Sequence, residues 1–265
     1  MAKLSGQLLF TGSLGMFTAY TAKGTEGIII RRKGGADKKK ISTSSRFART
    51  RENNEEWKGC GKGAAAIKRS IGDLKHLADH NISAPFTRIA SSARQKDIVS
   101  ERGKRNIYFS GCRHLLEGYE LNRNLLFTSV VRVLPACTLS RSDARATASF
   151  MDMQPGIHLV LPWNYPVYRF ILTLGFLPDM LLNDGVYEAP NKLLNNHGIT
   201  IRTDWFLSEK PFSAQSFSLQ PANLTGFNEN FSLVFAIGIE AGLLGREGIF
   251  EAVPNKGCGK LIAVV

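Results

Sequence analysis

The segment from Asn230 to Glu240, Asn-Phe-Ser-Leu-Val-Phe-Ala-Ile-Gly-Ile-Glu, alternates large apolar residues with smaller ones. Successive side chains of a β-strand point to opposite faces of its sheet, so this alternation predicts a strand. The large residues share one face and are Phe231, Leu233, Phe235, Ile237 and Ile239. The small residues share the other and are Ser232, Val234, Ala236 and Gly238.

The same period-two alternation recurs through the second part of the chain. Val167–Leu177 places Tyr168, Phe170, Leu172, Leu174 and Phe176 on one side, and Ile199–Leu207 alternates similarly. Further strands are expected at Leu125–Leu134, Ile157–Leu161 and Lys260–Val265. Short strands separated by Pro, Gly and Asn turns, with no helical periodicity between them, predict an antiparallel β-sandwich or barrel-like region over residues 121–265.

The first 120 residues follow a different pattern. Glycines separate three short apolar segments between Leu8 and Arg31, which predicts a small β-meander. After a basic loop, the Ser42–Ser45 cluster predicts the start of a helix that reaches Lys58. Amphipathic helices are also expected around Ile67–Ala78 and from Ser83 onward. The chain is therefore predicted to be an α+β protein with two unlike regions, residues 1–120 and 121–265.

Positive charge is concentrated in the first of these regions. Residues 1–120 contain 23 Lys and Arg residues and 11 Asp and Glu residues, whereas residues 121–265 contain 11 of each. Such asymmetry is typical of contact with nucleic acid or another polyanion, although basic residues also keep helical surfaces solvated. The candidate phosphate contacts are Arg31, Arg32, Lys33, Lys38, Lys39, Lys40, Arg46, Arg49 and Arg51.

The cysteines and the apolar segments bear on the cellular compartment. The four cysteines form no closely spaced pair, which predicts free thiols. The N-terminal apolar run is interrupted by glycines and is a poor secretory signal, and no apolar run is long enough for a transmembrane helix. We therefore expect a cytoplasmic protein without a membrane span.

Five short motifs are spread over most of the chain. They are Gly12-Ser-Leu-Gly15, Arg32-Lys-Gly-Gly35, Phe47-Ala-Arg-Thr-Arg-Glu-Asn53, Leu115-Leu-Glu-Gly-Tyr-Glu-Leu-Asn122 and Ala236-Ile-Gly-Ile-Glu240. Together they resemble a family of uncharacterised proteins from Bacteroidota, with Trp57 at a position where that family is expected to carry Phe. The resemblance implies a shared architecture and supplies no activity, cofactor or catalytic residue.

A search for catalytic chemistry finds no strong motif. The Gly59–Gly63 run before a helix suggests a phosphate loop, but it lacks the required spacing, so a hinge between helices is favoured. His76 and His80 are spaced to share a helical face, but no third metal ligand accompanies them. Cys112 and His114 are the densest nucleophile and base pair, and chance explains them better. No cofactor, metal site or catalytic residue is predicted.

Two classes of function fit these observations. The first is a non-enzymatic structural or assembly protein, similar at fold level to small capsid-type proteins, in which the β-region self-associates into a homo-oligomer. Its basic region then contacts a polyanion or packs between subunits. The uncharged small-residue face of Phe231–Ile239 favours such contact, although burial inside one chain explains it equally well. The alternative is a nucleic-acid-binding accessory protein, and an enzyme of unrecognised type is third.

Overall fold

The computed structural model is an α+β structure and confirms the predicted fold class. It describes residues 2–4, 6, 10–22, 26–191, 194, 198–222, 224–245 and 248–265. Contacts divide the chain into two compact units, Met1–Arg51 (unit 1) and Glu52–Val265 (unit 2). The predicted boundary between residues 120 and 121 lies inside unit 2, where helices that precede it and strands that follow it share a core.

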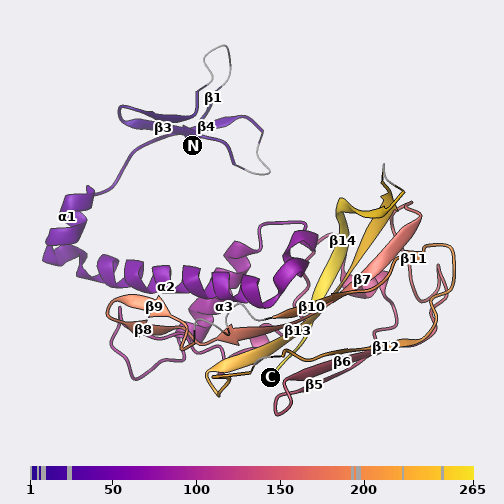
Figure 1. Cartoon of the computed structure of the whole chain (residues 1–265). Coiled ribbons are helices and arrows are strands. Elements are labelled where there is room, and N and C mark those ends of the chain that lie inside the picture. The colour runs from indigo at the N-terminus through magenta and orange to yellow at the C-terminus, as the bar shows by residue number, and fades with distance from the viewer. Residues whose placement is uncertain are drawn as a thin grey trace. The chain divides into compact units, whose positions relative to one another are not determined.

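Unit 1 begins with a small antiparallel sheet in the strand order β1-β4-β3-β2 (Figure 1). Its strands are β1 (Ala2–Leu4), β2 (Gly12–Leu14), β3 (Phe17–Tyr20) and β4 (Ile28–Arg32). The predicted meander is present, but Gly12–Leu14 is a strand rather than part of a turn. The first of the three expected segments was Leu8–Thr11; Leu8 and Leu9 lie outside the described residues, and Phe10 and Thr11 belong to no strand. Two short helices follow the sheet, α1 (Lys38–Thr43) and η1 (Ser45–Phe47).

Helix α2 (Ala48–Ser70) is continuous, so the predicted break at Gly59–Gly63 is wrong. Two of these glycines allow close packing instead. A Cβ atom at Gly59 would lie 2.6 Å from the ring of Tyr187, and one at Gly63 would lie 3.0 Å from the Cβ atom of Ala90. Glycine is unfavourable inside a helix by about 1 kcal/mol relative to alanine, and tertiary packing outweighs that preference here.

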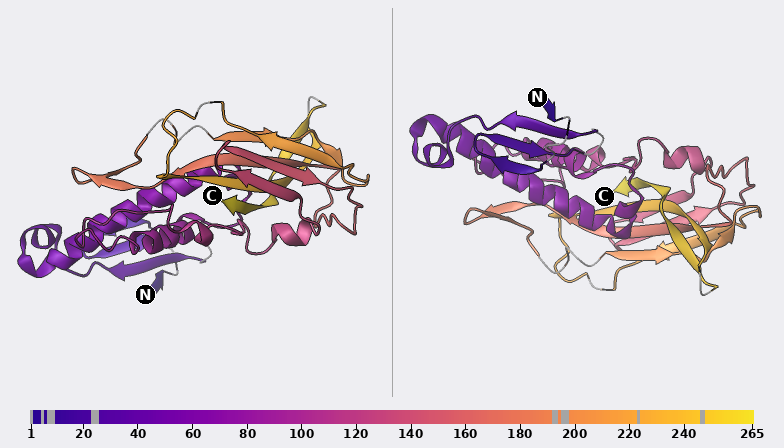
Figure 2. Two further views of the ribbon diagram at one scale, coloured as in Figure 1. Left: turned by 90° about the horizontal axis from the view of Figure 1, so that it is seen from below. Right: turned by 90° about the horizontal axis from the view of Figure 1, so that it is seen from above.

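Two further helical segments complete the helical layer of unit 2. The 3₁₀ helix η2 (Gly72–Leu77) continues from α2, and α3 (Ser83–Arg94) lies beside α2 (Figure 2). The predicted apolar face of the α3 segment is confirmed, because Phe86, Ala90 and Ala93 are all buried. These helices pack their apolar faces against a sheet.

Within the described residues of unit 2, the strands form one large sheet and two smaller ones, all antiparallel. The large sheet has the order β10-β7-β13-β14, with β11 also paired to β7. Its strands are β7 (Val167–Pro178), β10 (Ile199–Arg202), β11 (Phe206–Leu207), β13 (Phe231–Leu244) and β14 (Phe250–Val264). The smaller sheets contain β5 (Ala136–Ser140), β6 (Arg145–Phe150), β12 (Gln215–Leu219), β8 (Leu181–Asn183) and β9 (Val186–Glu188).

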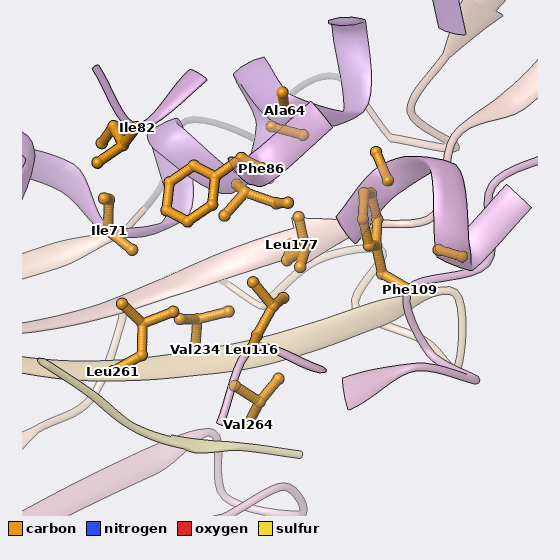
Figure 3. Packing of buried hydrophobic residues seen from close by; sticks show 14 of the residues in the cluster. Ala64, Ile71, Ile82, Phe86, Phe109, Leu116, Leu177, Val234, Leu261 and Val264 are labelled. Atoms are coloured by element: carbon orange, nitrogen blue, oxygen red, sulfur yellow. The ribbon is translucent and has the colours of Figure 1, made fainter. Parts of the chain in front are cut away.

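The large sheet is covered on both faces. The predicted large-residue faces of β7 and β13 are confirmed, because they line an apolar core shared with β6 and β12. The opposite face packs on α2, η2 and α3 in a second core, which includes Ile71, Phe86 and Val234 (Figure 3). Unit 2 is therefore a β-sandwich with a helical layer on the outer face of its larger sheet.

The small-residue face of β13 is buried by the chain itself. Ser232, Val234 and Ala236 are fully buried, and a Cβ atom at Gly238 would lie 2.4 Å from side-chain atoms of both Leu74 and Leu77. Burial within one chain is thus the correct explanation of that face, and its assignment to a contact between subunits is wrong. Small residues stand there because the helices approach the sheet closely.

Two expected strands are absent from their places. Leu125–Leu134 contains the one-turn helix α4 (Phe127–Val130). The backbone amide of Phe127 donates to the Glu120 carboxylate at 2.8 Å. Ile157–Leu161 is largely a turn and makes only isolated bridges through Leu159. The periodicity of apolar runs this short does not by itself distinguish strands from helical or irregular segments.

The prediction about the cysteines is confirmed. Cys60, Cys112, Cys137 and Cys258 are all free thiols. No helix in the described part of the chain combines the length and apolarity that crossing a membrane requires.

Candidate polyanion interface

The first group of predicted basic residues lies at the end of β4. Arg31 and Arg32 are exposed, and both belong to the antiparallel pairing with β3. The guanidinium of Arg31 lies 5.7 Å from the centre of the Tyr20 ring. The exposed Lys33 follows, and its amide donates to the Met16 carbonyl at 2.6 Å. The backbone at this end of β4 is therefore held by its pairing with β3, while the basic side chains are exposed to solvent.

The second group lies on α1, where the sequence suggested only a loop. Asp37 caps this helix, since its carboxylate accepts the Lys40 amide at 2.7 Å. Lys38, Lys39 and Lys40 are exposed, and no residue of α1 is buried. Because no side chain of α1 is buried, this helix contributes mainly a charged surface to unit 1.

The third group differs among its members. Arg46 on η1 and Arg49 at the start of α2 are exposed. Arg51 is half-buried, and its guanidinium donates to the carbonyls of Ile41 and Ser44, both at 2.8 Å. Arg51 therefore ties the end of α1 to α2, a structural role that the sequence did not reveal.

Unit 2 holds a charged cluster that the sequence did not indicate. Glu240 on β13 is 3% exposed and accepts hydrogen bonds from Arg169 on β7 at 2.7 Å and from His76 on η2 at 2.6 Å. Both ring nitrogens of His76 are used, because Nδ1 contacts the Asp73 carbonyl. The guanidinium of Arg169 also lies 4.3 Å from the centre of the Trp205 ring. With no free ring nitrogen, His76 is suited to holding η2 on the sheet rather than to proton transfer.

The two partners shift each other's ionisation in opposite directions. The hydrogen bond with Glu240 raises the pKa of His76 above its ordinary 6.5. Burial alone would raise the pKa of Glu240, but the hydrogen bonds and charges of His76 and Arg169 lower it below 4.5. The stabilisation from His76 is thus complete below pH 6.5 and is lost as pH rises through the raised pKa. That from Glu240 is present above pH 4.5 and is lost as pH falls through the lowered pKa.

We expect His76→Gln to lower the free energy of unfolding by about 1 kcal/mol in mildly acidic solution and by less in alkaline solution. The value lies below the usual range of about 1.5–3 kcal/mol for a hydrogen bond to a charged group, because the His76 side chain is 44% exposed. Urea unfolding as a function of pH measures the difference. His114→Gln, at an exposed position, is the control. An identical pH dependence of the two variants would contradict the assignment.

A second buried carboxylate joins the helices to the following loop. Glu56 on α2 is completely buried, and its carboxylate contacts Arg94 on α3 at 2.9 Å and Arg105 at 2.7 Å. It also accepts the Gly103 amide at 2.8 Å. Burial would raise its pKa, but the hydrogen bonds from Arg105 and Gly103 and the two guanidinium charges lower it, so Glu56 stays ionised.

The weak catalytic motifs are placed where they do not assemble a reactive centre. Lys62, in the glycine run, donates to the Tyr187 carbonyl at 3.0 Å. His76 and His80 contact different carboxylates, Glu240 and Asp79. Cys112 is buried, which raises the pKa of its thiol, whereas His114 is exposed.

Comparisons with protein families, with characterised proteins and with solved structures give no match to this chain. The resemblance to a family from Bacteroidota therefore stays an expectation. One of the motifs on which this resemblance rests, Leu115–Asn122, has a structural role. The side-chain amide nitrogen of Asn122 donates to the carbonyls of Leu77 and Gly257 at 2.7 and 3.2 Å. Asn122 thus joins η2 to β14.

Proposed function

We propose that this protein is a non-enzymatic polyanion-binding protein, in which unit 1 contacts the phosphate backbone of nucleic acid. One observation carries the proposal: the net charge follows the division into compact units. Residues 1–51 contain 11 Lys and Arg residues and two Asp and Glu residues, so they hold +9 of the total charge of +12. The remainder of the chain contains 23 basic and 20 acidic residues.

The placement of the side chains supports the same proposal. Eight of the nine predicted contacts are exposed, and Arg51 alone is half-buried. Phosphate contacts of this kind depend on charge and carry no sequence information directly, so binding is expected to be sequence-independent and strongly weakened by salt. No base-reading residue is assigned.

We expect the triple variant Lys38→Ala, Lys39→Ala and Lys40→Ala to weaken binding to DNA and RNA by a similar factor for different sequences. For each phosphate contact removed, the slope of log affinity against log salt concentration should also decrease in magnitude by about 1. Fluorescence anisotropy of labelled oligonucleotides over a series of salt concentrations measures both effects.

A matched control separates local contacts from overall charge. Lys58, Lys75 and Lys256 are exposed lysines of unit 2, and replacing all three by alanine removes the same charge. The proposal expects this control to bind nearly as well as the natural chain. If both triple variants bind equally weakly, or if neither is affected, Lys38–Lys40 do not form the site.

Self-association is a second candidate, and three apolar side chains of unit 1 favour it. Leu14, Met16 and Phe17, around the turn from β2 to β3, are 63%, 54% and 47% exposed. Exposed apolar patches commonly mark contacts with other proteins. Light scattering of the full chain at low and high salt tests this candidate, since a salt-resistant oligomer supports it and the mass of one chain under all conditions contradicts it.

A further inference from the structure

Two aromatic side chains are exposed in the part of the chain that the structure describes. They are Phe17 on β3 and Trp57 on α2, which are 47% and 60% exposed. The other described Phe, Tyr and Trp residues are buried or partly buried. Because aromatic rings gain free energy when they leave water, a folded chain usually covers most of their surface. These two rings are therefore available to a ligand.

Phe17 lies beside a basic side chain in unit 1. In the antiparallel pairing of β3 with β4, Phe17 is directly opposite Arg32. Directly opposite residues project from the same face of a sheet, with Cβ atoms about 4.5–5.5 Å apart. Arg32 is exposed and makes no ion pair with a described carboxylate. This face of the sheet therefore presents an aromatic ring next to an unpaired positive charge.

Trp57 lies beside a second cation in unit 2. With Lys58, Gly61 and Arg88 it lines a hollow of about 560 Å³ between α2 and α3. Gly61 follows Trp57 by one helical turn, and no atom lies within 4 Å of its Cβ position, so the hollow is open there. Lys58 is bound by Glu55 at 2.6 Å. Arg88 is exposed and has no carboxylate partner among the described residues, so its charge is available to a ligand.

This combination of rings and cations distinguishes between polyanions. Sulfated polysaccharides and polyphosphate carry charge but no flat aromatic group, so the exposed rings would add nothing to their binding. In a nucleic acid duplex the bases are stacked on one another and offer a protein only their edges. An unpaired strand offers both phosphates and free base faces. Stacking of one base on an aromatic side chain strengthens binding about 5- to 150-fold.

We infer that the nucleic acid bound by this protein is single-stranded, with Phe17 and Trp57 as stacking platforms for its bases. Arg32 and Arg88 contact the phosphates beside them. The inference rests on the proposed function, because it specifies the form of the nucleic acid whose phosphates unit 1 contacts. Every base has a flat face, so such stacking tolerates any sequence and agrees with the sequence-independent binding expected above.

The test is fluorescence anisotropy of the full chain with labelled oligothymidylate and with a duplex hairpin that has the same number of phosphates. The single strand should bind at least about tenfold more tightly. Phe17→Ala and Trp57→Ala should each weaken binding of the single strand about tenfold and leave binding of the duplex nearly unchanged. Trp57→Phe keeps an aromatic ring and should retain most of the affinity.

Each platform has a matched control. Leu14→Ala is the control for Phe17→Ala, because Leu14 pairs with Phe17 and is 63% exposed but has no aromatic ring. Ile98→Ala is the control for Trp57→Ala, because Ile98 is 89% exposed and lies outside the hollow. Neither control should change the affinity for the single strand.

Tryptophan fluorescence gives a second measurement on the same complexes. Trp57 is exposed, whereas the other two tryptophans of the chain are partly buried. A base that stacks on Trp57 should quench its emission, so the single strand should quench the natural chain and quench the Trp57→Phe variant much less. Equal quenching of the two proteins would contradict stacking at Trp57.

Failure of the inference can be told apart from failure of the proposed function. If single strand and duplex bind equally and the aromatic variants change nothing, the inference is overturned, whereas a loss of binding in the Lys38–Lys40 variant still supports the proposed function. If the aromatic variants dissociate an oligomer without changing the affinity for the single strand, the rings contact protein and the inference is overturned. If neither form binds, the proposed function fails and the inference fails with it.

Discussion

Replacing Glu56 by glutamine is expected to lower the free energy of unfolding of unit 2 by about 3–5 kcal/mol. The substitution preserves the shape of the side chain and removes its charge. Arg94 and Arg105 then remain in a largely buried site, with side chains 14% and 22% exposed, and have no carboxylate at Glu56 to balance them. Urea unfolding followed by tryptophan fluorescence measures the loss, because Trp57, Trp163 and Trp205 all lie in unit 2.

The neighbouring Glu55 provides the control in the same helix. Its carboxylate contacts Lys58 at 2.6 Å, but the two side chains are 49% and 68% exposed. Exposed ion pairs of this kind contribute about 0.2–1 kcal/mol, so Glu55→Gln should have a small effect. Equal losses for the two variants would show that Glu56 makes no special contribution.

The same two residues show where sequence reasoning succeeds and where it stops. Glu52, Glu55 and Glu56 lie among basic residues, and the sequence favours ordinary helical ion pairs for all of them. That explanation holds for Glu55, whose partner is three residues away. The partners of Glu56 come from residues about 40–50 positions later, which a local pattern does not indicate.

Strands β7 and β13 were predictable because their side chains alternate between two different cores, whereas only the last part of β14 (Phe250–Val264) was expected, from Lys260 onward. Large apolar residues recur at every second position from Tyr168 to Phe176 and from Phe231 to Ile239, and both faces of these segments are largely buried. The break predicted in α2 was wrong because Gly59 and Gly63 allow close packing against Tyr187 and Ala90 and do not mark a bend. The boundary at residue 120 was predicted from charge and from the change in periodicity. Neither property shows that α2 and α3 pack on strands more than 70 residues away in the sequence.

The candidate sites also differ in whether they depend on residues that are close in the sequence or far apart in it. The basic residues of unit 1 were found from composition, because an exposed charged surface needs no tertiary partner. The charged cluster around Glu240 was missed, because His76, Arg169 and Glu240 come from three elements that are far apart in the sequence.

Replacing Gly175 by alanine is expected to lower the free energy of unfolding of unit 2 by about 3 kcal/mol or more. Gly175 lies in β7 where the end of α2 crosses the sheet. A Cβ atom there would lie 2.0 Å from the carbonyl oxygen of Ser70 and 2.7 Å from its carbonyl carbon. Because these are backbone atoms, no change of rotamer relieves the overlap, and the helix itself must move away from the core.

The same substitution at Gly61 in α2 should have the opposite sign. Gly61 is exposed, and a Cβ atom there would have no neighbour within 4 Å. Alanine at an open helical position is favoured over glycine by about 0.5–1 kcal/mol, so Gly61→Ala should stabilise unit 2. Urea unfolding of the two variants beside the natural chain measures both changes. If the Gly175→Ala variant were as stable as the natural chain, the backbone of α2 at Ser70 could not lie this close to β7 at Gly175.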